Sequence, residues 1–263
     1  MAMVRPTDMI TGTKVTIMDT RMTTDAVSSA ALYRLLAFLS PAFPIGAYTY
    51  SHGLEQVIEE EEVTDAQSLK IWLEDILRFG AGRSDIILAK ETMLAATRGD
   101  EATVRDLIDL GLALQPSRER HLETSAQGTA FINAVVKAWS PEGDSPAARV
   151  FANLTDISSQ NTPKSWPYPV AVGLTAAAWN LPTDATATGL LHAFSANIIS
   201  AAVRAVPLGQ SDGQRVLAAL EETIAEVTRE ALDAGLDELG TCNFLADIAS
   251  MAHETKYSRL FRS

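Results

Sequence analysis

Apolar residues recur at helical spacing along almost the whole chain. In "DGQRVLAALEETIAEVTREALDAG", which follows Ser211, one helical stripe carries Leu217, Leu220, Ile224 and Val227. No stretch alternates apolar and polar residues for long enough to indicate a β-strand. The periodicity therefore predicts an all-α protein, built as a single bundle of about ten helices.

Short polar residues mark where several of these helices begin. Their side chains can accept a hydrogen bond from an unpaired N–H of the first turn. Thr64 and Gln67 form a T-x-x-Q capping box, and the "GAG" at 80–82 favours a break or kink in the helix that follows. The other predicted N-caps are Ser28 or Ser29, Asp100, Ser117 and Ser145.

The chain divides into three parts by composition. Residues 1–28 have scattered charges and no apolar signal region, so we expect a disordered N-terminal extension. Residues 29–263 form the predicted helical domain, and 255–263 form a C-terminal tail. No run of 18 apolar residues occurs, so we expect no membrane span.

Charge and cysteine usage limit the classes of partner and compartment. The net charge is −12, and an acidic surface disfavours nucleic acid, because binding phosphates needs a basic one. Cys242 is the only cysteine, so no disulfide framework can form. We therefore expect a cytoplasmic protein that binds neither nucleic acid nor a membrane.

The chain offers little catalytic chemistry. Its four histidines lie far apart, in no zinc-binding, nucleotide-binding or nucleophile motif. The apolar segment "LLHAFSANIISAAVRAV" instead contains His192, Asn197 and Arg204. If that helix is buried, these residues form either a structural network, with Arg204 paired to a carboxylate, or an interface.

The chain ends in "HETKYSRLFRS", which mixes cations with two aromatic residues and a leucine. One interpretation is that Tyr257–Phe261 is the last turn of a docked helix with charges reaching solvent. The other is a recognition tail for a protein partner. The tail residues alone leave both interpretations open.

Three segments together resemble the urease accessory protein F (UreF) family. They are "LSPAFPIGAYTYSHGLE", "LHAFSANIISAAVRAVPLGQSDGQR" and "DIASMAHETKYSRLFRS", and "WPYPVAVGLTAAAW" is a looser match. The last of the three departs from the family at Ala252 and Lys256, where members commonly have Arg and Gln. Residues 1–28 lie outside the resemblance.

The resemblance implies a non-catalytic, all-α protein, usually a homodimer, that helps to mature urease. Members bind the accessory protein UreD (or UreH), recruit the GTPase UreG and govern it, and so allow nickel insertion into apo-urease. No cofactor is expected to bind stably, because the complex handles the nickel. The residues that the resemblance assigns to partner binding are Tyr257, Arg259, Leu260, Phe261, Arg262, Tyr48 and Glu55.

Two other functions remain open from the sequence. An all-α enzyme would bring His192, Arg204 and a carboxylate together in a buried pocket. A stand-alone nickel-carrying chaperone would gather several histidines or cysteines on one accessible patch.

Overall fold

A computed structural model describes residues 27–263, and these residues confirm the all-α prediction. The predicted extension falls outside the described residues, apart from its last two positions. The α-helices are α1 (Ser29–Phe38), α2 (Leu54–Glu59), α3 (Ala66–Phe79), α4 (Ala81–Thr97), α5 (Glu101–Ala113), α6 (Arg118–Ala138), α7 (Pro146–Thr155), α8 (Tyr168–Ala178), α9 (Thr183–Ala205), α10 (Gln210–Ala219), α11 (Glu221–Asp233) and α12 (Phe244–His253). Two short 3₁₀ helices, η1 (Ala47–Thr49) and η2 (Leu236–Glu238), interrupt the connections.

Four of the predicted N-caps accept the expected hydrogen bond from the backbone three residues on. They are Ser28, Asp100, Ser117 and Ser145. Each such bond stabilises a helix end by about 1 kcal/mol. Gly80 separates α3 from α4, as predicted from the "GAG" segment.

Two helix boundaries differ from the sequence prediction. The cap of α3 is Asp65, which forms a capping box with Ser68, and not Thr64 with Gln67. The long helix expected after Ser211 is two helices, because α10 ends and α11 begins at Leu220. Leu220 keeps helical backbone angles and is fully buried, so the apolar stripe continues across the break and the sequence periodicity does not show it.

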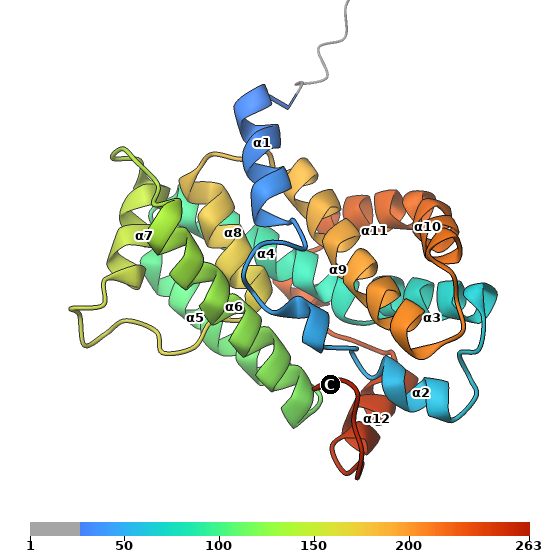
Figure 1. Ribbon diagram of the computed structural model, residues 1–263. Coiled ribbons are helices and arrows are strands. Elements are labelled where there is room, and N and C mark those ends of the chain that lie inside the picture. The colour runs from blue at the N-terminus through green and yellow to red at the C-terminus, as the bar shows by residue number, and fades with distance from the viewer. Residues whose placement is uncertain (1–26) are drawn as a thin grey trace, which may run out of the picture.

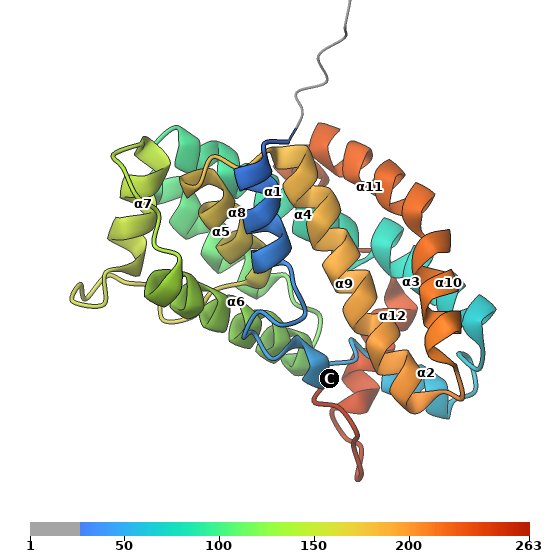
Figure 2. The same cartoon turned by 45° about the horizontal axis from the view of Figure 1, so that its top comes forward.

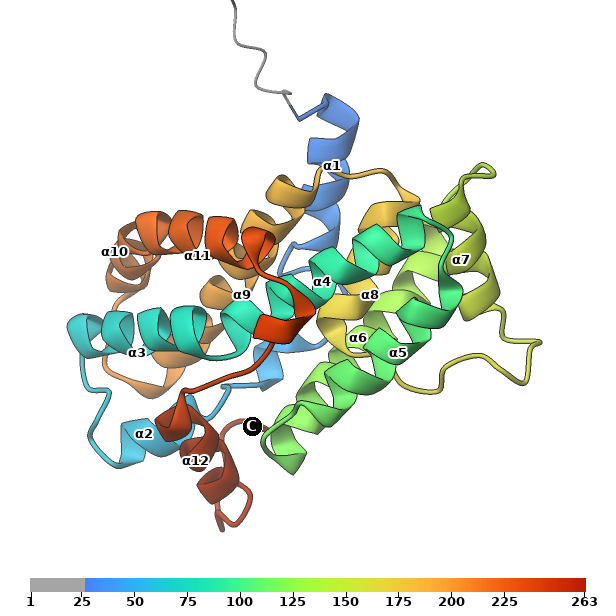
Figure 3. The ribbon, with the colours of Figure 1, turned by 180° about the vertical axis from the view of Figure 1, so that it is seen from behind.

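The core is built around α4 and α8, which cross near the middle of the molecule (Figures 1 and 3). Every residue of α8 from Pro169 to Ala178 is buried. A Cβ added at Gly173 would lie 2.4 Å from the Ala89 carbonyl oxygen, so the two helix backbones are in direct contact there. Small residues therefore set the spacing of the central pair.

The long helix α9 runs along one side of the core, between α1 and the α10–α11 pair (Figure 2). By length and composition alone it could cross a membrane. Half of that apolar stretch is buried inside the protein.

The C-terminal end lies at one end of the molecule, beside α2 and α6 (Figure 1). After α12 the chain turns back and meets the segment around η1. The Arg262 N–H donates to the Thr49 oxygen over 2.8 Å, and the Ser51 N–H donates to the Ser263 oxygen over 2.7 Å. The tail is therefore seated on the helical domain by main-chain hydrogen bonds.

Candidate functional site

Glu55, in the first turn of α2, holds the C-terminal tail in place, and its carboxylate is here called the seat of the tail. It is 8% exposed, and its two oxygens accept the N–H groups of Leu260 and Phe261 over 2.8 and 2.9 Å. Burial raises the pKa of Glu55, but the Leu260 N–H, His253 and the Phe261 N–H outweigh it and hold that pKa below its usual range. The ionised carboxylate thus serves as an anchor for main-chain donors.

His253 connects this seat to α6. Its ring is fully buried, with Nε2 3.0 Å from a Glu55 oxygen and Nδ1 2.7 Å from a Glu119 oxygen. The other Glu119 oxygen accepts from Arg259 Nη1 over 2.7 Å. His253 ends α12 and Glu119 lies in the first turn of α6, so each helix dipole favours the charge placed there.

The residues predicted to bind a partner divide into two groups. Phe261 (4% exposed) and Glu55 are buried in the protein itself. Tyr257 is fully exposed and Leu260 is 63% exposed. Arg259, Arg262 and Tyr48 are also exposed. Their role in partner binding stays a prediction, in which the first group would hold the tail and the second would face a partner.

The tail is not the last turn of a helix, since α12 ends at His253 and the following residues form bends. That interpretation of Tyr257–Phe261 is therefore wrong. The backbone of the tail and the Phe261 ring instead pack on the helical domain.

One side of α12 is exposed and apolar, which the sequence analysis did not single out. Its four residues, here called the α12 face, are between 48% and 73% exposed. They are Phe244, Leu245, Ile248 and Met251. Their spacing of i, i+1, i+4 and i+7 is visible in the sequence, but the same spacing is equally typical of a helix side that packs into a core.

The prediction of a buried polar network on α9 is wrong. His192 and Arg204 are exposed and Asn197 is half-buried. Arg204 donates to the oxygens of Tyr48 (2.7 Å) and Ser200 (3.0 Å), and no ion pair joins it to a carboxylate within residues 27–263. His192 and Arg204 thus face solvent, whereas Asn197 lines the pocket between α9 and the core, so the interface interpretation is left open. The enzyme hypothesis fails, because His192 and Arg204 do not enter a buried pocket.

A buried charge cluster that the sequence analysis missed lies on α6. Arg120 and Glu123, one turn apart, are 6% and 5% exposed and form an ion pair. Ser263 Oγ donates to the same carboxylate over 2.8 Å. Burial raises the pKa of Glu123, but Arg120 and His52 outweigh it and bring the pKa to about 2. Burial, with Arg120, lowers the pKa of His52 to about 4.

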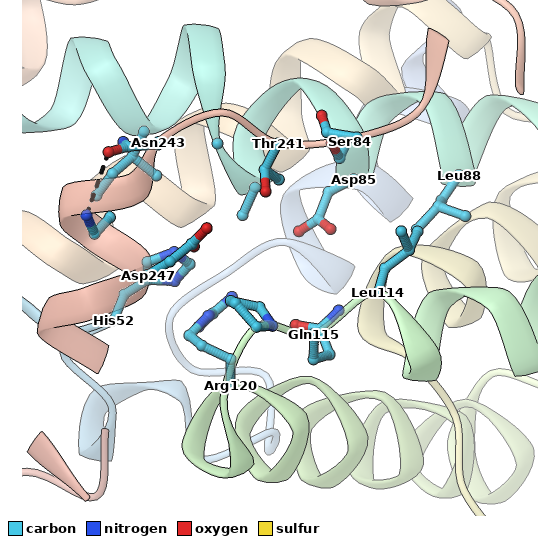
Figure 4. A pocket seen from close by; sticks show the side chains of 16 residues that line it. His52, Ser84, Asp85, Leu88, Leu114, Gln115, Arg120, Thr241, Asn243 and Asp247 are labelled. Carbon is cyan, nitrogen blue, oxygen red and sulfur yellow. Dashed lines mark hydrogen bonds between the residues drawn. The ribbon is translucent and has the colours of Figure 1, made fainter. Parts of the chain in front are cut away.

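Asp85 on α4 and Arg120 line two neighbouring hollows. One is a cavity of about 50 Å³, into which both side chains point (Figure 4), and the other is a pocket of about 180 Å³ beside α9. Burial raises the pKa of Asp85 to about 7. Among residues 27–263, no group of three or more His, Cys, Asp or Glu side chains is placed to hold a metal ion.

Comparison with known proteins places the chain in one family. The family model described as UreF matches residues 63–221. Urease accessory protein UreF of Rhodopseudomonas palustris strain BisA53 is 47% identical over 238 residues, which cover 90% of this chain and 95% of that protein. UreF of Methylobacterium sp. strain 4-46 is 48% identical over 229 residues, 87% of each chain. UreF of Bradyrhizobium diazoefficiens is 45% identical over 238 residues, 90% of this chain and 94% of that protein. The chain therefore belongs to the UreF family of urease accessory proteins and is not an enzyme.

Proposed function

We propose that the protein is a scaffold for nickel insertion into apo-urease. In this proposal it binds the UreD (or UreH) accessory protein, recruits the GTPase UreG and regulates GTP hydrolysis. Nickel is the cargo of the assembled complex, and the scaffold holds no resident cofactor. We infer further that it works in the cytoplasm as a homodimer.

The observation that carries this proposal is the α12 face together with the tail that follows it. Isolated exposed apolar residues are normal, but a helix that presents four of them on one side is typical of an interaction site. Tyr257 and Leu260 add two more exposed apolar side chains beyond that helix. Arg259 and Arg262 supply cations in a protein of net charge −12, which favours a partner surface with carboxylates.

The seated tail also makes binding energetically easier. Ordering a free backbone costs about 1–2 kcal/mol per residue. In this protein, folding itself has fixed much of the tail through Glu55, so a partner does not have to supply all of that free energy. Burying the exposed part of the four side chains of the α12 face would contribute about 1–2 kcal/mol each, because each is already partly buried. That gain can offset the loss of translational and rotational freedom on association.

A capture experiment with purified UreD (or UreH) tests the proposal. The Leu245→Asp, Ile248→Asp double variant should reduce capture by about 100-fold or more, because each charge would have to be buried at the interface. Ile157→Asp is a matched control, since Ile157 is 92% exposed and lies far along the chain in the connection after α7. Undiminished capture by the double variant would remove the α12 face from the proposal.

Regulation of the GTPase is tested separately. UreG should associate with the scaffold–UreD complex, and its rate of GTP hydrolysis should differ between the complex and UreG alone. An identical rate, with association verified by co-elution, would contradict the regulatory role while leaving the scaffold role intact. Light scattering of the isolated protein measures whether it is a dimer.

A further inference from the structure

His253 is placed so that only its doubly protonated form satisfies both neighbours. Nδ1 faces Glu119 and Nε2 faces Glu55, at 2.7 and 3.0 Å. A neutral imidazole carries one N–H and can donate to one carboxylate only. The other carboxylate would then meet a ring lone pair in a site that excludes water. The imidazolium donates to both, through two charge-assisted hydrogen bonds.

Glu55 and Glu119 differ in the cations that neutralise their carboxylates. Glu119, on α6, also pairs with Arg259 from the tail. Glu55, on α2, forms no ion pair with any lysine or arginine of residues 27–263. Lys256 pairs with Glu59 and reaches only the Glu55 main-chain oxygen, and Glu254, beside His253, accepts the Arg118 N–H. The imidazolium is thus the cation on the Glu55 carboxylate.

The same Glu55 carboxylate fixes the tail. The oxygen that faces His253 also accepts the Phe261 N–H, and the second oxygen accepts the Leu260 N–H. Any change that moves or repels this carboxylate therefore acts directly on the tail backbone. We propose that His253 is a proton-dependent positioning residue, which as an imidazolium holds Glu55 and Glu119 together and keeps the tail seated.

The sign of the pH dependence follows from the hydrogen-bond count. With the proton present, both carboxylates have a donor and the tail is held. As pH rises and His253 loses that proton, two buried carboxylates face one N–H, so the Glu55 seat weakens and the tail loosens. The tail is therefore held more firmly at slightly acidic pH than at alkaline pH. This behaviour belongs to the protein alone and needs no partner.

Amide hydrogen exchange of Leu260 and Phe261 in the full chain tests the proposal. After correction for intrinsic exchange, their protection should fall by about tenfold or more between about pH 6 and about pH 8.5. His253→Gln, which cannot carry the charge, should show weak protection at both values. His121→Gln is the matched control, because His121 is an exposed histidine on α6 and should leave the profile unchanged.

Two results would overturn the proposal. One is protection of the Leu260 and Phe261 amides that does not change with pH in the wild-type protein. The other is a His253→Gln variant that keeps the wild-type pH dependence. Exchange of the core amides of α4, followed in the same experiment, shows whether the His253→Gln variant is folded. If it is not folded, the pH dependence of the wild-type protein alone tests the proposal.

The consequence for function rests on the proposed capture of UreD (or UreH). If the tail is part of that interface, capture should weaken with rising pH in the wild-type protein and be insensitive to pH in His253→Gln. If capture fails altogether while the exchange profile is as expected, the proposed partner is wrong and the proton-dependent seat stands.

Discussion

The guanidinium group of Arg204 lies over the ring of Phe261, with Cζ 4.7 Å from the ring centroid. The contact joins the last turn of α9 to the tail. Arg204 also donates to the Tyr48 oxygen, so one side chain connects α9, η1 and Phe261. Arg204 therefore covers one face of the buried Phe261 ring and does not form the buried ion pair that was expected.

Arg204→Ala should lower the free energy of unfolding by about 1–2 kcal/mol, or a few degrees in melting temperature. The change removes a partly exposed cation–π contact and hydrogen bonds from a charged donor, but leaves no buried charge unpaired. Arg215→Ala is the control, since Arg215 is highly exposed and forms a surface ion pair with Asp212. A loss of 3–5 kcal/mol, as expected for a broken buried ion pair, would show that Arg204 is more deeply engaged.

Asp85→Asn should stabilise the protein at alkaline pH. Burial raises the pKa of Asp85 to about 7, so the folded state binds an extra proton from its usual range near 4 up to about 7, and stability is lost as pH rises through that window. Asparagine stays neutral, so its advantage over aspartate should grow by about 1–2 kcal/mol between about pH 5 and pH 8. Two hollows border this residue and can admit water, which keeps the figure below the full linkage value.

Denaturant unfolding at the two pH values measures the effect. Asp75→Asn is the matched control, because Asp75 is exposed on α3. An Asp85→Asn advantage of the same size at both pH values would contradict the linkage argument.

Gly128→Ala should be strongly destabilising, by about 3 kcal/mol or more. A Cβ at Gly128 would lie 2.0 Å from the Trp166 carbonyl oxygen, so α6 and the connection before α8 would have to separate. At Gly189, by contrast, the added carbon meets only the end of the Leu39 side chain. Gly189→Ala should therefore stay within about 1 kcal/mol of wild type, since better helix propensity offsets a small adjustment. Equal melting temperatures for the two variants would refute this assignment.

Local signals predicted the helices because they act within a few residues. Ser28 and Asp100 cap their helices as their side chains dictate, and Gly80 ends one. The break at Leu220 was missed because the apolar stripe continues across it and Leu220 keeps helical backbone angles. The burial of α9 was overestimated because its composition is mostly apolar. The sequence does not show that the side of α9 carrying His192, or the end carrying Arg204, faces solvent.

The candidate site was only half predictable. The resemblance located the tail, but the seat depends on residues about 130 to 200 positions away, Glu119 and Glu55, which meet His253 only in the fold. Sequence periodicity cannot show such a meeting. It also cannot tell whether the α12 face packs inward or remains exposed, because the spacing is the same in both cases.

Phe261 and Leu260 are neighbours that should separate the two tasks of the tail. Phe261→Ala removes a buried ring and should lower stability by about 2–3 kcal/mol, somewhat less than in a central core, because the tail can detach locally. Leu260→Ala should change stability by less than about 0.5 kcal/mol, since that side chain is 63% exposed. Against UreD (or UreH), however, Leu260→Ala should weaken capture about tenfold, as expected when a leucine buried at an interface is truncated.

Ile157→Ala is the control, because Ile157 is also exposed. The melting temperature measures stability and the capture affinity measures partner binding, both on the same samples. Phe261→Ala should also weaken capture, but through an unseated tail, so the Leu260 and Phe261 amides should lose exchange protection in that variant and keep it in Leu260→Ala. If Leu260→Ala leaves capture unchanged, the exposed side of the tail does not touch the partner. The tail would then be a structural strap that holds α2, α6 and α12 together.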